Sequence, residues 1–140
     1  MFAALHGQEA TLNVHPIAKA QGVGLADGSV GVGCSNRVET MNILPVTEAL
    51  LQRRDMFHRN TTGALSPAYV AAGRLLGCFE GHMNARGCLA GQLLIEEAGG
   101  GVETQDAGDS IAYGRRVVAG CADVFDDLLS IADAAWSGHP

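Results

Sequence analysis

The strongest helix signal in the chain is the stretch 64–76, and its apolar residues lie nearly all round the helix rather than on one face. A helix with this pattern has to be buried on most of its faces. Such burial requires that other elements pack against the helix on more than one side. The rest of the chain provides candidates, because short strand-like apolar runs alternate with further helical patterns. Strands that alternate with helices predict an α/β fold, a layered α/β domain with a short mixed sheet flanked by helices.

The remaining elements are predicted from short apolar runs and glycines. Near the N-terminus two apolar stretches flank Gly7, Gln8 and Glu9, a gap of the size of a turn, so a β-hairpin is expected. Gly31 and Gly33 lie in a strand-like run, where small residues predict that another group packs closely on the strand. Strands are expected over 29–34, 78–80 and 116–120, and further helices over about 37–54, 87–98 and 123–135.

Proline and glycine predict where two of these helices begin and end. Pro45 indicates that the helix after the 29–34 strand either kinks or starts nearer residue 46. Ser66 and Pro67 are expected as the N-cap and first-turn residues of the apolar helix, with Thr62 as an earlier capping candidate. Gly77 is expected as its C-cap.

Charge and composition exclude several classes of function. The 140-residue chain has 9 Lys and Arg against 15 Asp and Glu, a net charge of −6, which argues against nucleic-acid partners and a polybasic membrane patch. It has no apolar run near the roughly 18–20 residues of a membrane span, and no secretory signal is recognisable. The four cysteines lack paired spacing, so reduced thiols and a cytoplasmic location are expected.

Motifs for nucleophilic or nucleotide chemistry are absent from the sequence. No serine lies in G-x-S-x-G, no Walker sequence exists, and isolated G-x-G fragments indicate tight packing rather than phosphate binding. The histidines do not pair at i, i+4. His6 could face Glu9 across the hairpin, and Glu80 and His82 could share a strand face; together with His15 they leave open a new metal-dependent site, although surface or hydrogen-bonded roles are simpler.

A longer pattern is more specific than these. It runs from Arg59 to Leu75 (Arg-Asn-Thr-Thr-Gly-Ala-Leu-Ser-Pro-Ala-Tyr-Val-Ala-Ala-Gly-Arg-Leu), continues with Phe79-Glu80, and ends with Cys88-Leu-Ala-Gly and Glu97-Ala-Gly-Gly-Gly-Val. It resembles the C-terminal half of the inositol monophosphatase family, magnesium-dependent phosphatases of small phosphorylated alcohols. The first residues resemble the hairpin before that family's second domain. The resemblance implies an orphan hairpin over 1–20 and an α/β domain over 21–140.

The resemblance also implies which residues contact a substrate. Thr62, Gly63 and Ala64 match the family's Gly-Ser/Thr-Ala segment, where a helix start and backbone groups contact the substrate. Glu80 matches a glutamate that receives a substrate hydroxyl. The alternative for Glu80 is a retained surface carboxylate with no ligand.

The same resemblance shows that the family's magnesium ligands are missing. They come mainly from a Glu-Glu segment and an Asp-Pro-hydrophobic-Asp-Gly-Thr segment, and neither occurs in this chain. A further aspartate preceded by tryptophan is replaced by Arg86-Gly87. Magnesium is therefore the family's expected cofactor without its ligands here, and no catalytic residue is assigned.

These observations predict a truncated inositol monophosphatase-like protein with at most weak hydrolase or phosphatase activity. One alternative is a non-catalytic remnant that binds small molecules or forms oligomers, and another is a new metal-dependent activity at an oligomer interface. The expected partners are a small polyol or phosphate and a second copy of the chain, because a hairpin without its larger sheet exposes strand edges and an apolar face.

Overall fold

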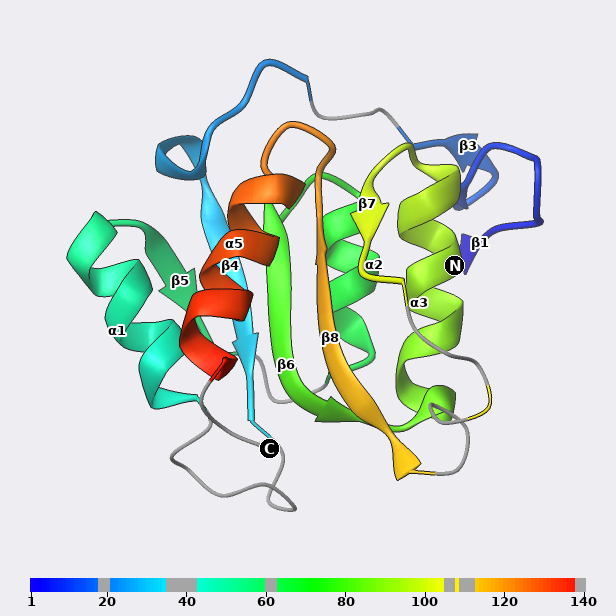
Figure 1. The fold of residues 1–140 in the computed structure, drawn as a ribbon. Helices are drawn as coiled ribbons and strands as arrows, with labels where there is room; N and C mark the ends of the chain where they lie inside the picture. Colours follow the sequence, from blue (N-terminus) through cyan, green and yellow to red (C-terminus); the bar gives the residue numbers. More distant parts are fainter. Residues whose placement is uncertain (18–20, 35–42, 60–62, 105–107, 109–112, 138–140) are drawn as a thin grey trace.

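The computed structural model describes residues 1–17, 21–34, 43–59, 63–104, 108 and 113–137. Short strands and four helices alternate along most of this length, as expected for an α/β chain (Figure 1). In chain order the elements are β1 (Phe2–Ala3), β2 (Thr11–Leu12), β3 (His15–Pro16), a 3-10 turn η1 (Leu25–Asp27), β4 (Ser29–Gly33), α1 (Leu44–Arg53), β5 (Met56–His58), α2 (Leu65–Ala71), β6 (Gly77–Met83), α3 (Ala85–Glu97), β7 (Gly101–Val102), β8 (Arg115–Gly120) and α5 (Phe125–Trp136).

The main sheet has five strands in the order β5-β4-β6-β8-β7. β4 is parallel to both of its neighbours, β5 and β6, whereas β8 runs antiparallel to β6 and β7. The sheet is therefore mixed, as the sequence predicts. The longest strand, β6, lies at its centre.

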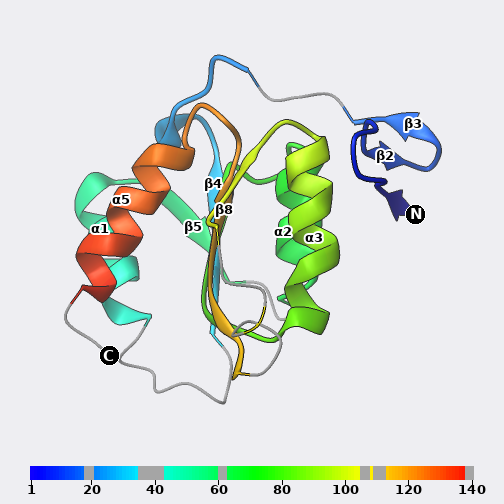
Figure 2. The same ribbon diagram turned by 45° about the vertical axis from the view of Figure 1, so that its right-hand side comes forward.

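Helices cover both faces of this sheet, with α1 and α5 on one side and α2 and α3 on the other (Figure 2). Alternate residues of β6 point to opposite faces. Phe79 packs in the core under α1 and α5 with Leu50 and Leu128, whereas Cys78 packs in the core under α2 and α3 with Ile95. Each helix layer thus has its own apolar core, divided by the sheet. α2 owes its apolar character on many sides to this three-layer packing.

The first sixteen residues form a separate small antiparallel sheet, β1-β2-β3, beside α3 (Figure 2). Gly7 has a φ of 78°, which only glycine adopts readily, in the loop between β1 and β2. Glu97 of α3 holds this loop, because its Oε1 accepts a 2.8 Å hydrogen bond from the Gly7 backbone N–H and lies 3.4 Å from His6 Nδ1. The predicted hairpin is confirmed by the β1–β2 pairing, and β3 extends it.

The ends of the apolar helix differ from the prediction. α2 ends at Ala71, with Ala72 as its C-cap, and Gly73 has a φ of 69°. Gly77 is the first residue of β6 and not a helix cap. The residues before it are apolar because they belong to the cores under the helices; Leu76 donates its backbone N–H to Ser29 O.

Of the two helix starts predicted from proline, the one at Ser66 and Pro67 is wrong, and a start of the other near Pro45 is confirmed. Ser66 and Pro67 lie within α2 and are buried, and the N-cap is Ala64. α1 begins at Leu44, so Pro45 occupies its first turn and produces no kink. Proline suits that position because a first-turn N–H has no partner in the helix. The remainder of the predicted 37–54 helix, before residue 43, lies outside the described residues.

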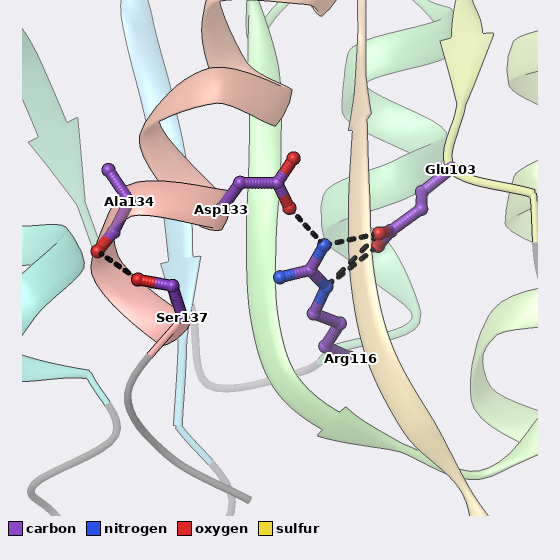
Figure 3. Close-up of polar contacts among 5 residues, drawn as sticks. All are labelled: Glu103, Arg116, Asp133, Ala134 and Ser137. Carbon is purple, nitrogen blue, oxygen red and sulfur yellow. Dashed lines mark hydrogen bonds and ion pairs between the residues drawn. The ribbon is translucent and has the colours of Figure 1, made fainter.

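The last helix, α5, is fixed to the sheet by Arg116 of β8 (Figure 3). The Arg116 guanidinium donates hydrogen bonds of 2.5–3.2 Å to Glu103, which follows β7, and one of 2.5 Å to Asp133 of α5. It also lies 5.6 Å from the ring centre of Trp136, whose ring meets Phe79 edge to face. One arginine therefore joins β7, β8 and the end of the chain's last helix.

No helix in the described part of the chain is long and apolar enough to cross a membrane. Cys78, Cys88 and Cys121 are free, buried thiols. Reduced thiols are what the unpaired spacing of the cysteines predicts.

Candidate functional site

The topology of the sheet singles out one edge as the place for a ligand. β4, β5 and β6 are parallel, so their carboxyl ends meet at the same edge of the sheet. β5 and β6 lie on opposite sides of β4, and the connections through α1 and α2 run over opposite faces. In open α/β sheets ligands bind outside the carboxyl ends of strands at such a switch point.

Glu80 is the middle residue of β6, and it lies level with the carboxyl end of β4 because it is paired in register with Gly33, the last residue of β4. Its side chain is only 5% exposed. A Cβ built on Gly33 would lie 1.6 Å from Glu80 Oε1, which is far inside van der Waals contact. The carboxylate therefore occupies space that exists only because residue 33 is a glycine.

A second glycine lies against the same carboxylate. A Cβ built on Gly63, two residues before α2, would lie 3.2 Å from Glu80 Oε1. Gly33 and Gly63 thus bring bare backbone from two elements to the Glu80 side chain. Because neither glycine has a side chain, the acid has apolar Cα groups beside it and little water.

Burial changes the acidity of this group. Desolvation raises the pKa of Glu80 from 4.5 to about 7, and the positive charge of Arg59, which follows β5, opposes that rise. Near neutral pH the carboxyl group is therefore divided between its neutral and ionised forms. The neutral form can donate a hydrogen bond, and both forms can accept one.

Met83 at the end of β6 forms the next wall. Its side chain is 8% exposed, and its Cε would be 2.9 Å from a Cβ built on Gly63 and 3.2 Å from one built on Gly87 in the first turn of α3. The methyl group therefore lies between the start of α2 and the start of α3. Glu80, Gly63, Met83 and Gly87 are consecutive neighbours along this edge.

The structure brings together two of the four residues predicted to contact a substrate, Gly63 and Glu80. Ala64 is the N-cap of α2, next to Gly63 in the chain, and Thr62 lies outside the described residues. Glu80 is buried and is not a surface carboxylate, contrary to the alternative interpretation of the sequence. Sequence reasoning missed Gly33 and Met83 as parts of this site, although the small residues of the 29–34 strand predicted close packing there.

The chain is similar in sequence to SuhB proteins and to an inositol-1-monophosphatase. It is 31% identical over 139 residues to the Nus factor SuhB of Haemophilus influenzae, covering 93% of this chain and 49% of that protein. It is 33% identical over 122 residues to inositol-1-monophosphatase of Mesorhizobium japonicum, covering 86% and 46%. The chain thus spans about half the length of these curated relatives. No protein-family model matches it.

Solved structures agree with the sequence relatives. The inositol monophosphatase of Anabaena (Nostoc) sp. PCC 7120 superposes with a TM-score of 0.75 at 30% identity, covering 99% of this chain and 54% of that one. SuhB of Mycobacterium tuberculosis superposes with a TM-score of 0.79 at 26% identity, covering 96% and 54%. The chain is related to the inositol monophosphatase family. The α/β fold predicted from the sequence is shared with these neighbours.

The residues at this edge do not fit the divalent cation that an inositol monophosphatase relationship implies. Magnesium requires near-octahedral oxygen ligation, usually with carboxylates. Among the described residues, Gly33 and Gly63 lie against the Glu80 carboxylate, the Met83 methyl group lies beside Gly63 and Gly87, and neither the glycines nor the methionine offers a carboxylate. Within the described ranges no three His, Cys, Asp or Glu side chains are grouped so that they could hold a metal.

The alternative metal ligands considered from the sequence are also separated. His6 faces Glu97 of α3 and not Glu9 across the hairpin. The strand is irregular between Glu80 and Met83, so its simple alternation is interrupted where His82 lies. The His82 ring packs against Gly114, where a Cβ would lie 2.8 Å from its Nε2.

Proposed function

We propose that this relative of the inositol monophosphatases binds a small polyol at the carboxyl edge of its sheet, with Glu80 as the residue that receives a ligand hydroxyl. The observation that carries the proposal is the buried Glu80 carboxyl group, held between Gly33 and Gly63 at the switch point of the sheet. A carboxyl group accepts hydrogen bonds and, when neutral, also donates one, so it can pair with the hydroxyl group of a ligand.

The chemistry of the surroundings supports a hydroxyl-rich ligand. The two glycines allow the carboxyl group to lie against the backbone, and Met83 adds an apolar wall. Arg59 contributes a positive charge near Glu80, which suits a ligand that also carries a phosphate. A small polyol, free or phosphorylated, therefore matches the residues at this edge.

The same residues favour at most weak phosphatase activity for this chain alone. Phosphate-ester hydrolysis with magnesium depends on cations that activate water and neutralise the transferring phosphoryl group. Among the described residues, no three His, Cys, Asp or Glu side chains are grouped to hold such a cation. We propose that the protein works as a binding domain in the cytoplasm, and that any strong hydrolysis requires carboxylates from another polypeptide.

An amide NMR titration with myo-inositol tests the binding proposal. We expect shifts at Gly33, Gly63 and Glu80, and a loss of affinity of about tenfold in Glu80→Gln, because a hydrogen bond to a charged group contributes about 1.5–3 kcal/mol. Glu96→Gln, on the exposed side of α3, is the matched control and should bind as the parent does. Equal affinity in the parent and Glu80→Gln would remove Glu80 from the site.

Turnover of inositol 1-phosphate with and without magnesium separates the enzymatic alternative from binding alone. We expect phosphate release close to that of a mock preparation. Magnesium-dependent turnover well above the mock, lost in Glu80→Ala, would instead establish the chain as an enzyme in its own right.

A further inference from the structure

We propose that Met83 keeps hydrated divalent cations out of the Glu80 site and so reserves it for uncharged hydroxyl groups. The inference concerns the same site as the proposed function, but it rests on a separate observation. That observation is the position of the Met83 methyl group between Gly63 and Gly87.

The distances show how completely the methyl group fills this space. Met83 Cε would be 2.9 Å from a Cβ on Gly63 and 3.2 Å from a Cβ on Gly87, both closer than ordinary carbon contacts of about 3.5–4.0 Å. The side chain is 8% exposed and packs in a small apolar cluster with Cys88 and Val117. It is therefore held from behind and closes the gap between the starts of α2 and α3.

A magnesium ion beside Glu80 would need this same space. The ion binds oxygen atoms at about 2.0–2.1 Å and keeps several of its water molecules, so a protein site has to accommodate part of a hydrated shell. On the Gly33 side, the Glu80 carboxylate already lies against the strand, where a Cβ would be 1.6 Å away. On the Met83 side a methyl group can neither ligate the ion nor accept a hydrogen bond from its water.

A hydroxyl group makes smaller demands. It needs one hydrogen-bonding partner, it carries no hydration shell that must be accommodated, and its carbon skeleton can contact a methyl group favourably. Cation-independent binding of a polyol is the expected behaviour.

Manganese, a paramagnetic substitute for magnesium, tests the exclusion without reference to any activity. Four proteins are compared by broadening of their amide NMR signals: the parent, Gly87→Asp, Met83→Ala/Gly87→Asp and Met83→Leu/Gly87→Asp. The new aspartate supplies a second carboxylate, and an acidic residue suits the first turn of α3. Alanine opens the gap, whereas leucine keeps it filled.

We expect no manganese broadening centred on Gly63, Glu80 and Gly87 in the parent. Met83→Ala/Gly87→Asp should bind manganese at least tenfold more tightly than Gly87→Asp or Met83→Leu/Gly87→Asp. Localised broadening in the parent would overturn the proposal, and so would equal manganese affinity in the alanine and leucine double variants. Well-dispersed amide spectra confirm that each variant is folded before it is compared.

A second measurement uses the parent protein alone. We expect the dissociation constant for myo-inositol to differ less than twofold between magnesium and a chelator. A tenfold gain in affinity with magnesium would contradict exclusion of the cation. If myo-inositol does not bind under either condition, the proposed function fails while the manganese comparison still decides the role of Met83.

Discussion

At the scale of single residues, one glycine determines where the acid of the site lies. Gly33 ends β4, and the carboxylate of Glu80 lies where any other residue would carry its Cβ. The Glu80 side chain therefore lies over β4 and beside Gly63, and it does not extend into water. The burial that raises its pKa follows from that position. The site is therefore built as much by the missing side chain at 33 as by the carboxyl group itself.

The acidity of Glu80 predicts how stability depends on pH. Its pKa in the folded state, about 7, is higher than the ordinary 4.5, so between these values the folded protein binds more protons than the unfolded chain. The free energy of unfolding should therefore fall as pH rises from about 4.5 through 7, by at most about 3 kcal/mol. Urea unfolding of the parent and Glu80→Gln over this range measures the contribution, and parallel curves for the two proteins would refute it.

Gly33→Ala should destabilise the protein because its methyl group would collide with Glu80. We expect a loss of about 1–3 kcal/mol, the usual range for overpacking, together with loss of polyol binding. In the Glu80→Ala background the same change should cost much less, since the colliding atoms are gone. Gly24→Ala is the control, because its Cβ would meet only Asp27 Oδ2 at an ordinary 3.7 Å. An equal cost of Gly33→Ala in both backgrounds would locate the strain elsewhere.

At the scale of elements, one arginine gives α5 a polar attachment to the sheet. Arg116 is the shared partner of Glu103 and Asp133, and its guanidinium also faces the ring of Trp136 (Figure 3). These hydrogen bonds raise the pKa of Arg116 further, so the group is charged at every practical pH. The attachment reaches the site indirectly, because Trp136 meets Phe79, the neighbour of Glu80 in β6.

Arg116→Met should therefore loosen the end of α5 while retaining much of the aliphatic packing. Arg116 and Asp133 are partly exposed, so we expect a loss of about 1 kcal/mol that shrinks at high salt. Trp136, the single tryptophan, reports the change directly by fluorescence. Arg86→Met, at an exposed position of α3, controls for the loss of a charge. No change in either stability or fluorescence would show that the helix is held by its apolar face alone.

At the scale of the whole molecule, the small N-terminal sheet lies at one side and leaves apolar side chains in water. Met1, Leu5 and Val14 are 84%, 64% and 83% exposed. Each of its strands is only two residues long, and such small sheets are marginal unless something packs against them. We propose that a second copy of the chain covers this surface.

Sedimentation velocity over a range of concentrations measures that association. We expect the sedimentation coefficient to rise with concentration, and the Leu5→Ser/Val14→Thr variant to remain monomeric. Leu51→Ser removes an exposed leucine from α1, away from this sheet, and should leave the association unchanged. A sedimentation coefficient that is constant at all concentrations would remove the predicted dimer.

Much of the fold was predictable because its longer elements carry strong local signals. β4, β8, α3 and α5 lie within two residues of their predicted bounds. The short strands β5 and β7 were not predicted, since two or three residues do not establish a period. α2 was predicted too long because Leu75 and Leu76, beyond its end, are apolar for reasons of tertiary packing. Such residues are apolar because they pack against groups that are distant in the sequence, and a local sequence pattern contains no information about those contacts.

The sequence could name some residues of the proposed site, but it could not show how they are arranged. Resemblance selected Gly63 and Glu80, which do lie together. It could not reveal that Gly33 makes room for the acid, because that contact joins two strands separated by more than forty residues of sequence. Nor could it assign Met83, whose role depends on the approach of α2 and α3.

The position of β6 at the centre of the sheet has a consequence for hydrogen exchange. Glu80 is paired on one side with Gly33 and on the other with Val117, so its strand has no open edge. Its backbone amide can exchange with deuterium only when the hydrogen bonds between the strands open. We therefore expect it among the most slowly exchanging amides of the protein. A ligand that binds this carboxyl group therefore stabilises the folded state of the whole domain. Ligand binding should slow deuterium uptake by amides far from the sheet edge where the ligand lies.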